Sequence, residues 1–165
     1  MPLFNKLGMR VVLIAIGKTK FAYIQHAIAD YNKKINQFLK FEYKEISNSN
    51  LKKISNLNIM REKEAEIILK YLNKEDKLIL LDERGKEFNS VEFSNYIETA
   101  FQSLARRLVF VIGGAYGFSD SIRKKADIIL SLSKMTFSHQ LTRIVFLEQL
   151  YRALTIINRH PYHNE

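Results

Sequence analysis

The chain has 165 residues and a mass of 19.3 kDa, with 26 Lys and Arg against 17 Asp and Glu and no cysteine. The length suits one domain, and a hydrophobic content of 47% is enough for a core, which excludes a wholly disordered chain. The lack of cysteine excludes disulfides, zinc–thiolate sites, iron–sulfur clusters and thiol nucleophiles. The four histidines form no spaced metal-binding motif, so we expect no metal ion.

The net charge of +9 favours a polyanionic partner, most plausibly nucleic acid, over an ordinary basic enzyme. No arginine-rich tail is present, so any basic surface has to be assembled by folding or by pairing of subunits. No segment reaches the roughly 18–20 apolar residues of a membrane span, and the start does not read as a secretory signal. We therefore expect a cytoplasmic protein with no membrane association.

The first half of the chain alternates between strand and helix patterns. The predicted elements are a buried strand at 11–16, a helix at 21–38, a short strand at 41–46, a loop at 48–58, a helix at 60–72 and a second buried strand at 77–81. A polar turn, Asp82-Glu83-Arg84-Gly85, is expected to close the last of these strands.

The second half continues the alternation. Its predicted elements are a helix from an N-cap at Ser90 to about 103, a strand at 108–112, a short helix capped by Ser119 or Asp120, a strand at 128–132 and a long helix at 139–158 capped by Ser138. The pattern predicts an α/β fold with a mainly parallel sheet. We expect one domain over residues 9–165, preceded by an extension at 1–8.

The long C-terminal helix is apolar on nearly three faces between residues 141 and 157. A surface this wide suggests that the helix covers the sheet and also meets another subunit. We therefore expect a homodimer.

Three strand ends carry unusual sequences, and ligands of open α/β sheets bind beyond such ends. They are the polar segment after Leu81, the glycine cluster Gly113-Gly114-Ala115-Tyr116-Gly117, and the segment Ser133 to His139. Glycine permits close approach of the backbone to a ligand and positive φ. The spacing is neither a dinucleotide fingerprint nor a P-loop, so a tight structural turn is the alternative.

The C-terminal tail, His160-Pro161-Tyr162-His163-Asn164-Glu165, concentrates groups that can act as a base, a stacking platform or phosphate contacts. The alternative is a tail merely packed by Pro161 and Tyr162.

Four linked segments resemble the RlmH family, which are SPOUT-class methyltransferases of the large ribosomal subunit. The segments are Ile112 to Gly117, Leu130 to Arg143, Glu148 to Ala153 and His160 to His163, and the similarity extends over essentially the whole chain from Met9. The third residue of the glycine loop is often proline in the family and here is Ala115.

The resemblance implies helices on both faces of the sheet, a C-terminal trefoil knot, S-adenosyl-L-methionine as cofactor, and a homodimer acting on the ribosome. The implied reaction is methylation of N3 of a pseudouridine in 23S rRNA. The expected cofactor-binding residues are Leu81, Gly113, Gly114, Leu132, Ser133, Lys134, Met135, Thr136 and Phe137.

Transfer to N3 requires loss of its proton, for which His139, His160 and His163 are candidate bases. Arg143 and Arg152 are candidates for holding phosphates or the deprotonated base, and Tyr162 for stacking. A different class of function fits the charge and tail equally well, namely a non-catalytic RNA-binding factor in ribosome assembly.

Overall fold

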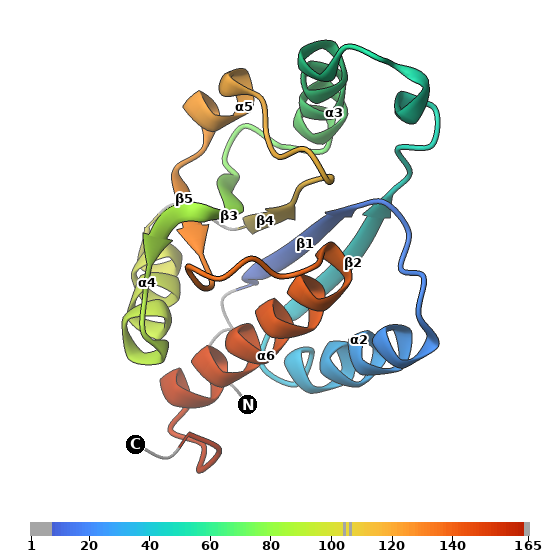
Figure 1. Cartoon of the computed structure of the whole chain (residues 1–165). Helices are drawn as coiled ribbons and strands as arrows, with labels where there is room; N and C mark the ends of the chain where they lie inside the picture. The colour runs from blue at the N-terminus through green and yellow to red at the C-terminus, as the bar shows by residue number, and fades with distance from the viewer. Residues whose placement is uncertain (1–7, 104, 106, 164–165) are drawn as a thin grey trace.

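The computed structural model describes residues 8–103, 105 and 107–163, and it contains an alternating series of strands and helices (Figure 1). Most of the predicted extension at 1–8 therefore lies outside the described residues. In chain order the elements are β1 (Arg10–Ile16), α2 (Ala22–Ile35), β2 (Lys40–Ile46), η1 (Leu51–Lys53), α3 (Leu57–Lys70), β3 (Lys77–Glu87), α4 (Ser90–Gln102), β4 (Arg107–Ile112), α5 (Asp120–Lys125), β5 (Ile128–Ser131) and α6 (His139–Ile157).

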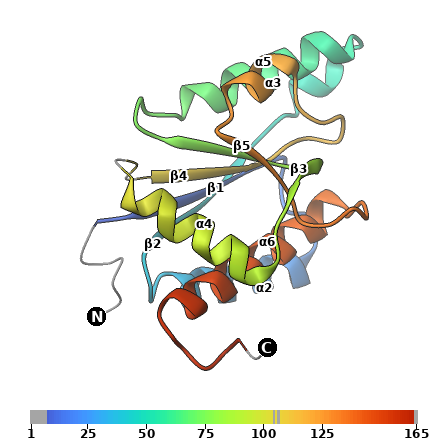
Figure 2. The same cartoon turned by 90° about the vertical axis from the view of Figure 1, so that its left-hand side faces the viewer.

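The five strands form one sheet in the order β2-β1-β4-β3-β5, and every described pairing is parallel. Helices α2, α4 and α6 cover one face, and α3 and α5 cover the other (Figure 2). The predicted α/β class with a parallel sheet and helices on both faces is confirmed. The trefoil knot stays a prediction, because the strand pairings do not test how the chain is threaded.

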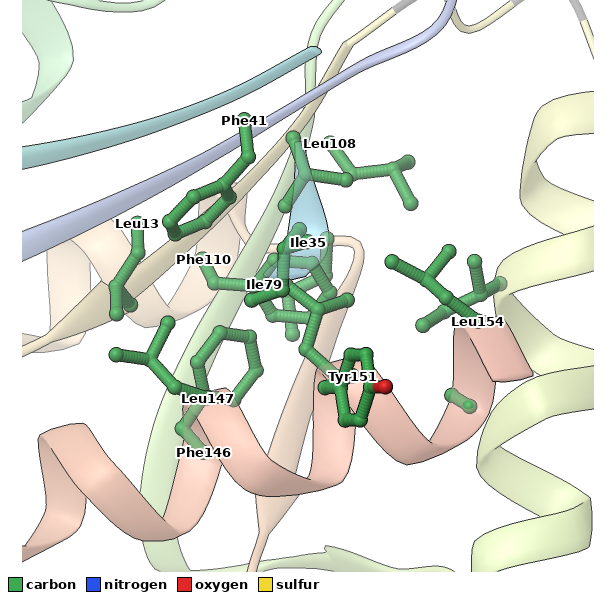
Figure 3. Close-up of a cluster of buried hydrophobic side chains, with 14 of the residues drawn as sticks. Leu13, Ile35, Phe41, Ile79, Leu108, Phe110, Phe146, Leu147, Tyr151 and Leu154 are labelled. Atoms are coloured by element: carbon green, nitrogen blue, oxygen red, sulfur yellow. The ribbon is translucent and has the colours of Figure 1, made fainter. Parts of the chain in front are cut away.

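Each face of the sheet packs its own hydrophobic core. On the α6 side, Leu13 and Phe110 contact a cluster that includes Phe146 and Leu147 (Figure 3). On the other side, alternate residues of the same strands pack against Ile68 of α3 and Ile122 of α5. Burial on both faces explains why these strands read as continuous apolar runs rather than as alternating patterns.

The wide apolar surface of α6 is largely used within the chain. Helix α6 lies over the sheet, with α2 and α4 packed against its flanks (Figure 1). Phe146, Leu147, Leu150 and Leu154 are completely buried. Leu141, in the first turn, is 44% exposed. The apolar surface still open to another subunit therefore includes the start of the helix.

Several element boundaries differ from the predicted ones. Strand β3 continues through the predicted polar turn, because Lys86 and Glu87 pair with β5 after a register shift. Helix α4 is capped by Asn89 rather than Ser90, and the Asn89 and Glu92 side chains form a reciprocal capping box. The predicted loop at 48–58 contains η1, and α3 already begins at Leu57.

Candidate active site

A pocket of about 510 Å³ lies where β3, β4 and β5 lead into the segments that follow them. The three strand ends singled out in the sequence all line it. The lining residues are Arg61, Leu81, Asp82, Glu83, Arg84, Ile112, Gly113, Gly114, Ala115, Tyr116, Gly117, Phe118, Leu130, Leu132, Ser133, Met135, Thr136, Phe137, His139 and Thr142. Lys134 is the one expected cofactor-binding residue that does not belong to this lining.

The glycine loop, residues 113–117, forms one wall of the pocket, and its glycines serve different purposes. Gly117 has a φ of +76°, a conformation that favours glycine. At Gly113, an added Cβ would lie 3.0 Å from two ring atoms of Phe118. At Gly114, an added Cβ would lie 2.7 Å from the carboxylate of Glu64 on α3. Positive φ is thus required at Gly117, and close packing explains the other two positions.

The loop between β5 and α6 forms the opposite wall. The Ser131 hydroxyl donates to the carbonyl of Ser133 at 2.9 Å, and the Ser133 hydroxyl accepts from the N–H of Met135 at 3.0 Å. The Thr136 hydroxyl donates to Glu83, which links this loop to β3. The Met135 side chain is 76% exposed, so it is available to contact a ligand rather than filling the core.

Asp82 and two arginines make the β3 side of the pocket strongly polar. The N–H and Nε of Arg84 donate to Asp82 Oδ1 at 2.9 and 3.2 Å, and Arg123 from α5 pairs with Oδ2. Burial raises the pKa of Asp82, but hydrogen bonds and the positive charges outweigh burial and hold that pKa below its usual range. The carboxylate is therefore ionised at neutral pH.

His139 begins α6 at the edge of the pocket, after the N-cap Ser138, whose side chain accepts the N–H of Leu141. Partial desolvation and then the nearby Arg143 guanidinium lower the pKa of His139, whereas a backbone hydrogen bond with Gly113 acts in the opposite direction. The imidazole is consequently neutral at neutral pH, which is the form that accepts a proton.

Arg143 lies behind the pocket, in the buried space between β1, β2 and α6. Its guanidinium is 1% exposed and donates to Thr19 Oγ1 at 2.6 Å, to the Tyr43 hydroxyl at 3.0 Å and to the Gly17 carbonyl at 3.0 Å. Glu45 Oε1 is 3.3 Å from Nη1. Within one chain, Arg143 therefore connects α6 with β2 and with the segment that follows β1, and it does not line the pocket.

The tail segment 160–163 follows the C-terminal end of α6, at the end of the helix far from His139 (Figure 1). A helix of 19 residues spans about 28 Å, so the tail does not reach the pocket of its own chain. The Tyr162 hydroxyl donates to Glu148 at 3.0 Å, and its ring lies edge-on to Tyr151. Arg152 stacks over Tyr162 and is 3.3 Å from His163 Nδ1.

Apart from Arg143, which is buried behind the pocket, and Lys134, which does not line it, the predicted site residues fall into two groups. The strand ends and His139 meet in the pocket, whereas the tail and Arg152 form a second polar cluster about one helix length away. Sequence reasoning missed Arg61, which lines the pocket, and Glu64 behind it. The burial of Glu64 could have been predicted from the sequence, because Glu64 lies four residues from both Met60 and Ile68 and so falls on the apolar, buried face of α3.

The chain belongs to the SPOUT methyltransferase family. The family model described as "Predicted SPOUT methyltransferase" matches residues 9–163, which is nearly the whole chain. Membership of this class, inferred above from four linked motifs, is confirmed.

Curated relatives place the chain close to one kind of protein within that family. It is 49% identical over 95% of its length to the whole of "Ribosomal RNA large subunit methyltransferase H" from Parabacteroides distasonis. Proteins of the same name from Cytophaga hutchinsonii and Flavobacterium johnsoniae are 47% and 49% identical over 94% and 95% of this chain, and the match covers 100% of each.

Among solved structures, a far more distant likeness is to the SpoU methyltransferase AviRb from Streptomyces viridochromogenes. The identity is 9% and the TM-score 0.43, over 86% of this chain and 56% of that one. Within the described residues, no group of acidic or histidine side chains is arranged to hold a metal ion. No helix in that part of the chain is long and apolar enough to cross a membrane.

Proposed function

We propose that this protein is an S-adenosyl-L-methionine-dependent methyltransferase of 23S rRNA, and that its target is N3 of a pseudouridine. The observation that carries the proposal is the meeting of three strand ends in one pocket, with His139 at its edge. The relatives named as large-subunit rRNA methyltransferases support the substrate class.

The pocket fits a cofactor that has both a flat apolar part and polar ends. Its volume of about 510 Å³ is within the usual range for small-molecule sites. Leu81, Leu132 and Phe137 supply apolar walls, and the backbone groups of the two loops offer donors and acceptors to an adenine edge. Asp82, Glu83 and Arg61 place charges around the same space.

When bound, the cofactor supplies a methyl carbon activated by a sulfonium, so the nucleophile needs alignment and loss of a proton rather than metal activation. The walls of the pocket would hold the cofactor and orient its methyl group toward the nucleophile, which would account for much of the expected rate. A ring nitrogen of neutral His139 would take the N3 proton as the N3–methyl bond forms and the bond from that methyl carbon to sulfur breaks, which leaves the spent cofactor as a neutral thioether. Arg143 favours that neutral form of His139 through its charge and positions the start of α6.

The active form in this proposal is a homodimer working on the ribosome in the cytoplasm. Phe21 and Tyr23, which stack at 5.4 Å, are 47% and 66% exposed at the start of α2. The segment before α2 is joined to the start of α6, where Leu141 is exposed, because Gln140 hydrogen-bonds to the backbone of both Lys18 and Lys20. These exposed apolar side chains favour a partner chain at the start of α6. The tail of one subunit is then a candidate to complete the pocket of the other.

The decisive experiment measures methyl transfer from labelled S-adenosyl-L-methionine to ribosomes, followed by mapping of the modified nucleotide. We expect transfer to intact ribosomes from a strain lacking the modification, and cofactor binding by calorimetry. A non-catalytic assembly factor would bind ribosomes without transferring label, and that result would reject the proposal.

A further inference from the structure

We propose that Glu64 is a positioning residue for the cofactor pocket: its buried carboxylate holds the glycine loop, and Gly114 is glycine to accommodate that carboxylate. The inference rests on the proposed function, since it gives a purpose to a buried carboxyl group that methyl transfer itself does not use. Glu64 lies on α3 and is 5% exposed, and it is not among the residues that line the pocket.

The contacts of Glu64 point at the loop. The backbone of Gly114 packs against the carboxyl group, and Asn48 Nδ2 donates to Oε1 at 3.3 Å. Burial raises the pKa of Glu64, and the Asn48 side chain and the Gly114 N–H offset part of that rise. Burying an ionisable group is costly unless its oxygens are satisfied by donors. Here the donors come from the glycine loop and from the segment after β2, so the carboxylate joins two segments that are 66 residues apart in sequence.

The packing around Gly114 is equally specific. A Cβ at this position would lie 2.7 Å from Oε1, 3.0 Å from Oε2 and 3.2 Å from Cδ of Glu64. Contacts this short force a displacement of the loop or of the carboxyl group. The absent side chain of Gly114 therefore leaves room for Glu64, on the α3 side of the loop.

Helix α3 holds the same loop at a second point. Arg61 is one turn before Glu64, and its Nε donates to the carbonyl of Tyr116 at 2.8 Å. Arg61 thus binds an acceptor of the loop at Tyr116, and Glu64 faces the backbone N–H two residues earlier, at Gly114. Two such contacts fix the direction of the loop backbone, which lines the pocket from Gly113 to Gly117.

The test combines substitutions at both positions with titration by S-adenosylhomocysteine, a stable analogue of the spent cofactor. Gly114→Ala should weaken binding by about tenfold or more, which corresponds to about 1.4 kcal/mol. Glu64→Ala should weaken it by about tenfold, because the loop N–H loses its acceptor. Glu64→Gln keeps a carbonyl acceptor and should stay within about threefold of the unmodified protein. Glu66→Ala, an exposed change on the same helix, is the matched control and should have no effect.

The double variant Glu64→Ala/Gly114→Ala distinguishes the two possible causes of the Gly114 defect. If the methyl group conflicts with Glu64, the double variant should bind no more weakly than Glu64→Ala alone, because the space has been vacated. If the two losses simply multiply, the methyl group conflicts with something else and the inference is wrong. Normal binding by Glu64→Ala would also overturn it. Should Glu64→Ala fail to fold, Glu64→Met fills the space without an acceptor and takes its place.

A measurement without ligand separates this inference from the proposed function. The amide proton resonance of Gly114 should lie downfield in the unmodified protein and in Glu64→Gln, and should move upfield in Glu64→Ala. A pocket that binds no cofactor at all would reject the proposed function and leave this resonance shift intact. An unshifted Gly114 resonance in Glu64→Ala would reject the contact between Glu64 and the backbone of Gly114, whatever the pocket binds.

Discussion

His139 is the residue in the pocket whose protonation has the most direct consequence for the proposed chemistry. Its pKa lies below the ordinary value of 6.5, because desolvation and Arg143 both disfavour the imidazolium. A base must be neutral to accept a proton, so methyl transfer should be constant near neutral pH. It should fall only as the pH drops through this lowered pKa, and the acid limb should therefore lie below 6.5.

Replacing His139 by Asn should reduce single-turnover methyl transfer by about 100-fold or more and remove the acid limb from the pH profile. Binding of S-adenosylhomocysteine should change little, because the substitution keeps a polar side chain at the edge of the pocket. His26→Asn, an exposed change on α2, is the control and should keep the full rate. An unaltered rate and profile for His139→Asn would assign the proton transfer to another group.

Individual residues also show where sequence reasoning stops. The glycine cluster and the segment 132–137 were recognisable because their residue types are unusual at strand ends. The buried environment of Arg143 could not be predicted from the sequence, because an arginine near the start of an amphipathic helix normally faces solvent. Its burial depends on Thr19, Tyr43 and Glu45, which are about 100 residues or more away in sequence and accept hydrogen bonds from Nη1 only in the folded chain.

At the scale of elements, the alternation of apolar strands and amphipathic helices was sufficient to predict the order of elements and the parallel sheet. The course of β3 was not predictable, because Asp82-Glu83-Arg84-Gly85 has the composition of a turn. These residues continue the strand since β5 pairs with both Leu81 and Lys86 and supplies the partner on either side of the irregularity. Because β5 lies about 40 residues later in the chain, the sequence around residues 82–85 itself does not indicate that the strand continues.

Gly85 marks this irregularity and should be sensitive to substitution. An added Cβ would lie 2.5 Å from the carbonyl oxygen of Ile129, and backbone cannot move aside as a flexible side chain can. We expect Gly85→Ala to lower the free energy of unfolding by about 2 kcal/mol or more. The measurement is urea denaturation at fixed protein concentration, with the exposed Glu87→Ala as control. An unchanged midpoint would mean that β3 and β5 can separate without cost.

At the scale of the whole molecule, the two polar clusters lie at opposite ends of α6, and one chain cannot bring them together. The tail is nevertheless held in place. The Glu148 carboxylate accepts hydrogen bonds from the hydroxyls of Tyr31 and Tyr162, and it forms an ion pair with Arg152. A second copy with its tail near this pocket would unite a cofactor site with a stacking and hydrogen-bonding segment. Catalysis would then require two chains.

This arrangement predicts complementation between two inactive variants. Deletion of residues 160–165 removes few core contacts, so it should leave folding and dimerisation nearly intact while reducing methyl transfer by orders of magnitude. Gly114→Val should prevent cofactor binding. When the two variants are mixed and allowed to exchange subunits, half of the subunits in mixed dimers have an intact pocket facing an intact tail. Ribosome methylation should therefore return in the mixture, although each variant alone is inactive. If the tail served the pocket of its own chain, every pocket in the mixture would remain defective, and no activity would appear at any mixing ratio.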